Sequence, residues 1–267
     1  MDIKAMREKL NAMKKKGGPE HIWKPEEGET TIRIVPLKGN ADNPFQVLYF
    51  HYNLGGKTYL SPMSYDERDP LAEFSDALIA EHTGRMAKEE FKTAKQFYPQ
   101  ARTYVPIIVR GSEKEGVKFW AFGKQTYEKL LAFIADDEYG DISDVSTGTD
   151  ITVTFTPEKK SDTGFAKTDF VLKRKSSPLT TDKELLKTWL NDQPVLLDSF
   201  TKTTADELSK LLDKALSDPT DTATPTPVAV SAKQNDADFL NTPSVTVATK
   251  DTSAAIKELE DIFADKD

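Results

Sequence analysis

Residues 97–134 carry the clearest strand pattern in the chain and constrain its fold most strongly. Thr103, Val105, Ile107 and Val109 fall on one face of an expected strand. The residues of the opposite face are Arg102, Tyr104, Ile108 and Arg110. After a charged turn at 111–116 the alternation resumes, with Val117, Phe119 and Ala121 on one face and Lys118, Trp120 and Phe122 on the other. The pattern predicts two paired strands, each placing a cation and an aromatic ring two residues apart on one face.

That shared face suits a flat, negatively charged ligand. The alternative is a half-buried hairpin that carries ordinary surface charges. The two interpretations differ in where the rings lie: burial of Tyr104 and Trp120 on the side of Val105 would remove the argument for a binding face.

Composition excludes several classes of protein. The chain has 267 residues and no cysteine, so disulfides, thiol catalysis and cysteine-ligated zinc are excluded. No apolar run reaches membrane-spanning length, and the start of the chain (MDIKAMREKL) is too charged for a signal peptide. We expect a soluble, internal protein without a membrane partner.

The net charge of −8 is distributed unevenly. Residues 1–18 have a net charge of +4, residues 213–267 of −6, and the body between them of −6. The apolar residues Ile3, Met6, Leu10 and Met13 predict a short basic amphipathic helix in the arm at 1–18. Residues 217–250, rich in Asp, Thr, Pro and Ala, predict a flexible linker.

The last segment, 251–267, is expected to be an acidic amphipathic peptide that docks on a partner. Its apolar residues are Ile256, Leu259, Ile262 and Phe263. Acidic side chains surround them, and the stretch that joins the segment to the body has few large apolar groups, so docking is a better explanation than a place in the core.

The body at 19–216 combines short strands with helices. The strands are expected at 30–37, 45–52, 57–60, 151–155 and 169–174, and Gly55-Gly56 forms a hairpin turn. The helices are expected at 70–81, 85–97, 123–135, 181–191 and 204–216. This order predicts a mainly β protein of the α+β class, a small barrel with an inserted helical subdomain at about 61–97 and helices at its C-terminal end.

The chain shows no recognisable catalytic machinery. Its three histidines, His21, His51 and His82, lack metal-ligand spacing, and no glycine-rich phosphate loop occurs. We therefore expect a protein that is not an enzyme and carries no cofactor or metal. Two other functions stay open: a protein–protein adaptor, and a nuclease whose metal-binding carboxylates come from scattered positions.

What remains is a binding surface of cations interleaved with rings. The candidate residues are Arg33, Lys57, Tyr59, Arg102, Tyr104, Lys118, Trp120, Lys124, Phe165 and Lys167. Such a surface suits single-stranded nucleic acid, because cations follow the phosphates and bases stack on rings. Some of these rings must belong to the core, and Tyr59 and Phe165 are ranked lowest as ligand contacts.

Ordered landmarks over roughly residues 23–170 resemble the helix-destabilising single-stranded DNA-binding proteins of T-even-type phages. The landmarks are GETTIRIVPLKGN, NPFQVLYFHYN, GGKTYL, RTYVPIIV, GVKFWAFGKQTYEKLLAFI and GFAKTDF. The resemblance implies an OB-like barrel and DNA contacts from Arg33, Tyr59, Arg102, Tyr104, Trp120 and Phe165.

The resemblance also implies roles for the two ends of the chain. In the family the basic arm mediates cooperative self-association along the strand, which here points to Lys4, Arg7, Lys14, Lys15 and Lys16. The acidic tail recruits replication and recombination proteins such as a polymerase, a helicase or a helicase loader. The expected setting is DNA replication, recombination and repair in the cytoplasm of an infected bacterial host.

The family's zinc site is where this sequence departs from the pattern. The family binds zinc through one histidine and three cysteines, and only His51 has a match here. We expect Leu71, Phe74 and Leu78 to pack as a hydrophobic substitute, with His51 an ordinary strand residue. The alternative is zinc bound by His51 with Asp66, Asp69 or His82, which is unfavourable because structural zinc prefers thiolates.

Overall fold

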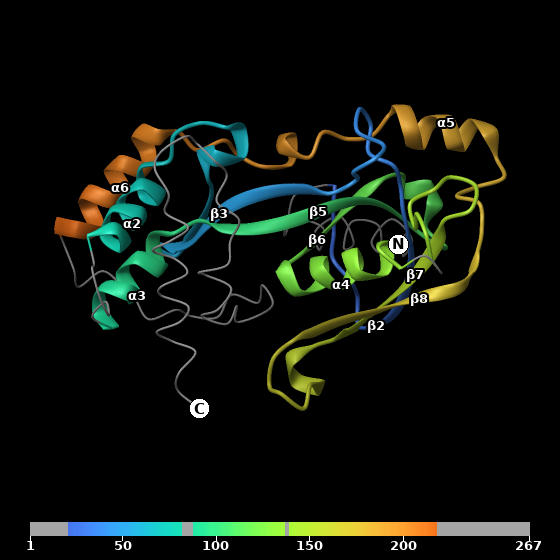
Figure 1. Ribbon diagram of the computed structural model, residues 1–267, viewed down its shortest axis with the longest axis horizontal. Coiled ribbons are helices and arrows are strands. Elements are labelled where there is room, and N and C mark those ends of the chain that lie inside the picture. The colour runs from blue at the N-terminus through green and yellow to red at the C-terminus, as the bar shows by residue number, and fades with distance from the viewer. Residues whose placement is uncertain (1–20, 82–87, 137–138, 218–267) are drawn as a thin grey trace, which may run out of the picture. The chain divides into compact units, whose positions relative to one another are not determined.

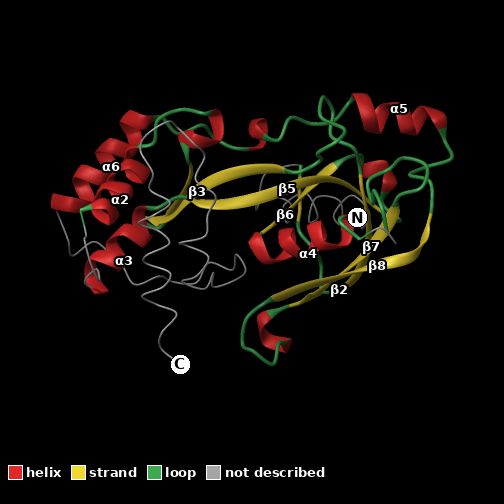
Figure 2. Ribbon diagram, viewed as in Figure 1, coloured by secondary structure: helices red, strands yellow, loops and turns green. Residues whose placement is uncertain are grey.

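The computed structural model describes residues 21–81, 88–136 and 139–217, which form a mixed α/β structure rich in strands (Figures 1 and 2). The strands are β1 Ile22–Trp23, β2 Gly28–Ile34, β3 Gln46–Leu54, β4 Lys57–Leu60, β5 Gln100–Val109, β6 Lys118–Phe122, β7 Thr149–Thr156 and β8 Lys167–Ser176. The α-helices are α2 Pro70–Ala80, α3 Lys88–Phe97, α4 Lys124–Ile134, α5 Lys183–Asn191 and α6 Ala205–Ser217. No helix in these ranges is long and apolar enough to cross a membrane.

The chain divides into two compact units. The first comprises Met1–Gln46, Tyr104–Ser161 and Lys167–Phe200, and the second comprises Val47–Thr103, Asp162–Ala166 and Thr201–Asp267. The division predicted from sequence, a core at 19–216 with an insertion at 61–97, stays a prediction.

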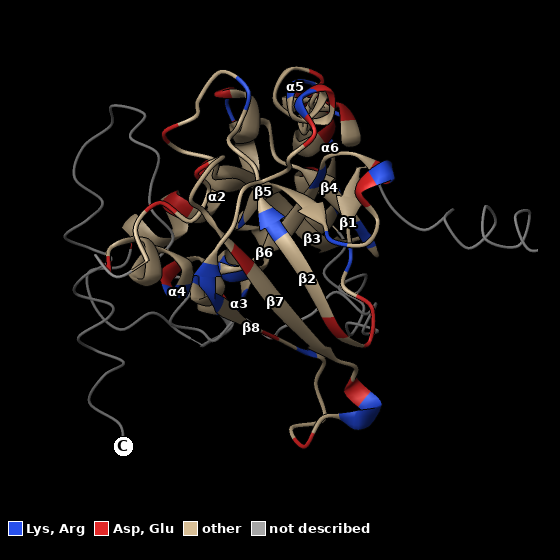
Figure 3. Ribbon diagram, turned by 90° about the vertical axis from the view of Figure 1, so that its right-hand side faces the viewer, with Lys and Arg blue, Asp and Glu red and all other residues tan. Residues whose placement is uncertain are grey.

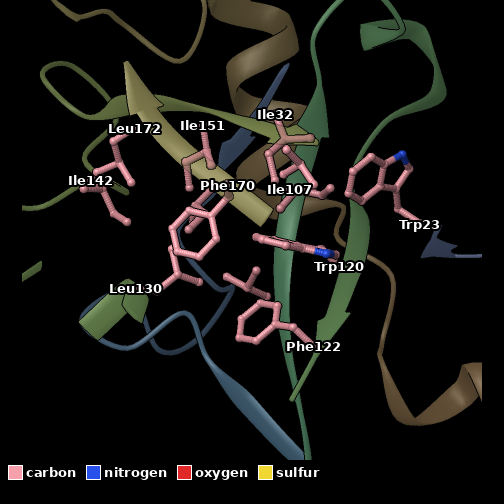
Figure 4. Packing of buried hydrophobic residues seen from close by; sticks show 13 residues of the cluster. Trp23, Ile32, Ile107, Trp120, Phe122, Leu130, Ile142, Ile151, Phe170 and Leu172 are labelled. Carbon is pink, nitrogen blue, oxygen red and sulfur yellow. The ribbon is translucent and has the colours of Figure 1, made fainter. Parts of the chain in front are cut away.

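The first unit is built on one sheet whose strands follow the order β1-β6-β5-β2-β7-β8. β2 is antiparallel to β5 and β7, and β7 is antiparallel to β8. In this register Ile32 of β2 lies opposite Val109 on one side and Ile151 on the other. The apolar residues of neighbouring strands therefore meet on one face of the sheet, where Leu130 of α4 joins them (Figure 4).

The predicted hairpin is present, but both of its faces are covered. β5 and β6 are neighbours in the sheet, as expected. Val105 and Ile107 lie in the cluster that α4 covers, whereas Ile108 of β5 packs from the other face with Val117 and with Trp189 of α5. A strand buried on both faces reads as a nearly continuous apolar run, and VPIIV is such a run.

The second unit combines the hairpin of β3 and β4 with three helices. Gly55 and Gly56 have φ angles of 57° and 73°, the positive values that a type I′ turn needs, and Leu54 pairs with Lys57 across it. The predicted hairpin turn is thus confirmed. Leu71 of α2 and Leu208 of α6 belong to one buried cluster, and α2 contacts both α3 and α6 (Figure 1).

Several predictions concern residues beyond the described ranges. They are the arm at 1–18 with the five cations named for self-association, His82, the linker from residue 218 to 250, and the tail at 251–267 with the four apolar residues named for docking.

Candidate nucleic-acid interface

Trp120 is a core residue. Its side chain is 1 % exposed, and its ring meets those of Phe122, Phe170 and Trp23 edge to face, with centroid distances of 4.8, 6.1 and 6.2 Å (Figure 4). It shares this cluster with Val105. The expectation that Trp120 stacks on a base is therefore wrong, because a ring that is 1 % exposed and packed in the core has no surface open to a base.

Tyr104 is also buried, on the side of β5 opposite Val105 in the strand alternation. Its ring is 5 % exposed and contacts Phe200 edge to face at 5.8 Å. The argument for a ligand-binding face on the hairpin consequently fails for both rings that suggested it.

Arg33 lies inside the first unit, where it is fully buried. Its Nη1 bonds Asp150 Oδ1 at 3.2 Å, while its Nη2 donates to the backbone carbonyls of Ser177 and Asp144. Burial lowers the pKa of Arg33, and the carboxylate of Asp150 acts in the opposite direction. The expected DNA contact of Arg33 is corrected: its guanidinium binds protein groups in the interior.

Two predicted cations lie at the surface of the first unit in ion pairs. Lys118 pairs with Glu115, and Lys124 lies 3.8 Å from Glu128 Oε1. Such surface pairs contribute about 0–1 kcal/mol, so a phosphate can replace the carboxylate at little cost. A role for these two lysines stays a prediction.

Phe165, Lys57 and Lys167 are the predicted contacts that are exposed. The Phe165 ring is 48 % exposed, and both lysines are exposed as well. Tyr59, by contrast, is half-buried and packs against the cluster around Leu54. Phe165 is therefore not a core ring, and its role as a ligand contact stays a prediction.

Arg102 has a partner that the sequence patterns did not single out. Its Nε donates to the hydroxyl of Tyr52 on β3 at 3.3 Å, and the Tyr52 ring lies 6.0 Å from that of Phe50, tilted by 32°. Tyr52 and Arg102 are both half-buried. The available signal was the spacing of Phe50 and Tyr52 on one face of a strand.

The second unit therefore gathers rings and cations that a strand of nucleic acid can use. We call these residues the aromatic–cation group: Tyr52, Lys57, Tyr59, Arg102 and Phe165. Residues 162–166, which carry Phe165, belong to the same compact unit as β4 and the start of β5. Cations for phosphates and rings for bases are thus both present in this unit.

The sequence predicts that His51 is an ordinary strand residue, but the structure shows that it is part of a buried hydrogen-bond group. It is fully buried, and its Nε2 donates to Asp69 Oδ2 at 2.7 Å. Ser61 Oγ donates to the same carboxylate oxygen, while Asp69 Oδ1 accepts the backbone N–H groups of Leu71 and Ala72 at the start of α2. One carboxylate thus ties β3, the segment before α2 and the helix itself together.

The described residues around His51 do not assemble the zinc-ligand set of the resembled family, and His82, one of the candidate ligands, lies outside them. The described part of the chain contains no group of three or more His, Cys, Asp or Glu residues arranged to hold a metal ion. The Nε2 atom of His51 already binds Asp69. Leu71 and Phe74 pack in the helical cluster nearby, as the hydrophobic substitute requires.

Comparison with known proteins identified one family. A family model described as "gp32 DNA binding protein like" matches residues 26–218, which is more than half of the chain. A search of curated proteins found no match.

Proposed function

Because the chain belongs to the gp32-like family of DNA-binding proteins, we propose that it binds single-stranded DNA without sequence specificity. The family is not one of enzymes. One observation suggests which surface binds the DNA, namely the aromatic–cation group. In this group Phe165 is half exposed, and Tyr52 accepts a hydrogen bond from Arg102. Stacking contributes about 1–3 kcal/mol per base and is tolerant of sequence, so a few such contacts suffice for general binding.

The wider role follows as part of the same proposal. The protein coats single strands during phage DNA replication, recombination and repair and keeps them unpaired, in the cytoplasm of an infected bacterium. The arm at 1–18 supports cooperative binding, and the acidic tail at 251–267 recruits replication proteins. As part of the same proposal, the antiparallel strands at the centre of the first unit's sheet belong to an OB-like barrel.

Replacing Phe165 with alanine is expected to weaken binding to an oligo(dT) of single-site length by about tenfold to a hundredfold, because one stacked base loses its ring. Stability should change by less than about 1 kcal/mol, since about half of the side chain is exposed. Fluorescence titration and urea denaturation measure the two quantities.

The matched control is Val195→Ala, which shortens another exposed apolar side chain, 58 % accessible, in the first unit. It should leave both affinity and stability unchanged. Equal affinities for the Phe165 variant and this control would remove Phe165 from the interface.

A further inference from the structure

Strand β8 contains an irregularity in which basic residues are concentrated. Ile151 of β7 pairs with Leu172, and two residues earlier Thr149 pairs with Ser176. Two residues of β7 therefore span the distance that four residues of β8 cover. The extra length is a bulge that contains Lys173, Arg174 and Lys175, and we call these three residues the basic bulge. Bulges change the direction of side chains and are frequent at functional edges of sheets.

The three side chains of the basic bulge are exposed. Among the described residues, none of them forms an ion pair. Other surface lysines do: Lys129 pairs with Asp169 at 2.6 Å, and Lys160 pairs with Glu27. The bulge thus holds three adjacent positive charges that no described carboxylate neutralises at close range.

The neighbouring interior adds to this excess of positive charge. Arg33 and Arg110 both bind the same oxygen, Oδ1 of Asp150, at 3.2 and 2.9 Å. Arg33 also bonds Ser177, the residue that follows β8. Asp150 is shared between two guanidinium groups beside the bulge, so it has little capacity to balance further cations. Figure 3 shows the blue ends of β2 and β8 on either side of β7.

We propose that the basic bulge binds phosphate groups of a single-stranded nucleic acid. The proposal rests on the proposed function and adds to it a site on the first unit, separate from the aromatic–cation group of the second. β8 is the last strand in the order of the first unit's sheet, so its outer side has no neighbour among the strands of that path. An extended phosphate backbone can follow such an edge.

The chemistry of the bulge suits phosphate. The guanidinium of Arg174 can form two parallel hydrogen bonds with a phosphate, and the flanking lysines act as point charges. The exposed hydroxyl of Ser176 is a further donor of the kind that contacts nucleic-acid backbones.

The test compares two full-length variants that lose the same charge. The first is Lys173→Gln/Arg174→Gln/Lys175→Gln. The control is Lys183→Gln/Lys187→Gln/Lys210→Gln, which removes three exposed lysines from α5 and α6. Affinity for oligo(dT) is measured by fluorescence between 0.1 and 1 M NaCl. Each phosphate contact on a single strand contributes about 0.7 to the slope of log affinity against log salt.

We expect the bulge variant to lose about 2 from the magnitude of that slope, with the control close to wild type. Relative to wild type, the affinity of the bulge variant for oligo(dT) should fall by up to about a hundredfold more at 0.1 M than at 1 M salt. A second control, Lys173→Arg/Lys175→Arg, keeps the charge and should retain the wild-type slope. That result shows that the smaller slope of the Gln variant comes from the lost charge.

Equal slopes for the bulge variant and the control would overturn the proposal. It is likewise overturned if the bulge variant keeps its slope but no longer binds a synthetic peptide of residues 251–267, since the site then takes an acidic peptide. If wild type and both variants all fail to bind the oligonucleotide, the proposed function itself is wrong. If wild type binds the oligonucleotide and the bulge variant binds it equally well, only the site proposed at the basic bulge is wrong.

Discussion

Replacing Trp120 with alanine is expected to lower the free energy of unfolding by about 3–5 kcal/mol, the range for removing a large buried aromatic side chain. The indole is 1 % exposed and contacts Trp23 of β1, Phe122 of β6 and Phe170 of β8, so its loss leaves a cavity that these strands cannot easily close. Urea denaturation followed by circular dichroism measures the change as a lower transition midpoint.

Trp120→Phe is the control, because it keeps an aromatic ring in the cluster and should cost clearly less than alanine. The alanine variant that remains folded should bind oligo(dT) with an affinity near that of wild type. A Trp120→Ala protein as stable as wild type, but weakened in binding single strands, would restore the stacking role that the sequence suggested.

Replacing Asp69 with alanine is expected to cost a similar 3–5 kcal/mol near neutral pH. The change leaves the buried His51 and Ser61 without their shared acceptor and removes the N-terminal cap of α2. Glu73→Gln, on the exposed side of the same helix, is the control and should stay within about 1 kcal/mol of wild type.

The contribution of Asp69 should also depend on pH. Burial acts to raise the pKa of Asp69, but the hydrogen bonds from His51, Ser61 and the Ala72 N–H outweigh it, so the pKa lies below the ordinary carboxyl value. A lowered pKa contributes stability that is fully present above the unfolded-state value near 4 and is lost as the pH falls through the folded-state value.

Denaturation of wild type and Asp69→Asn at several pH values between 7 and 3 tests this. The difference in unfolding free energy should be constant above about pH 5 and shrink below pH 4. A difference that stays constant down to pH 3 would mean that the carboxylate gains nothing from its partners.

Local signals in the sequence predicted the elements of the fold well. Gly55-Gly56 specified its turn because only two consecutive positive φ angles close that hairpin. Asp182 and Thr204, residue types that favour helix caps, lie at the starts of α5 and α6. Asp182 accepts the N–H groups of Glu184 and Leu185. Such signals act within a few residues, so they can be recognised in the sequence without knowledge of the tertiary contacts.

The accessibility of the candidate residues was not predictable in the same way. Strand alternation places Arg33 and Trp120 on a face but does not say whether another layer covers that face. Arg33 is buried because Asp150 and Ser177, more than a hundred residues away in sequence, supply its partners. The exposure of Phe165 was not predictable because a ring in a polar turn has no periodic pattern by which to judge it.

The central claim is that this protein binds single strands in preference to duplex DNA, and one measurement tests it most directly. Wild-type protein is titrated with oligo(dT) and with a duplex of equal length over a range of salt concentrations. We predict quenching of Tyr and Trp fluorescence with the single strand, an affinity that falls steeply with salt, and much weaker binding of the duplex. Equal affinity for the duplex and the single strand would contradict the account.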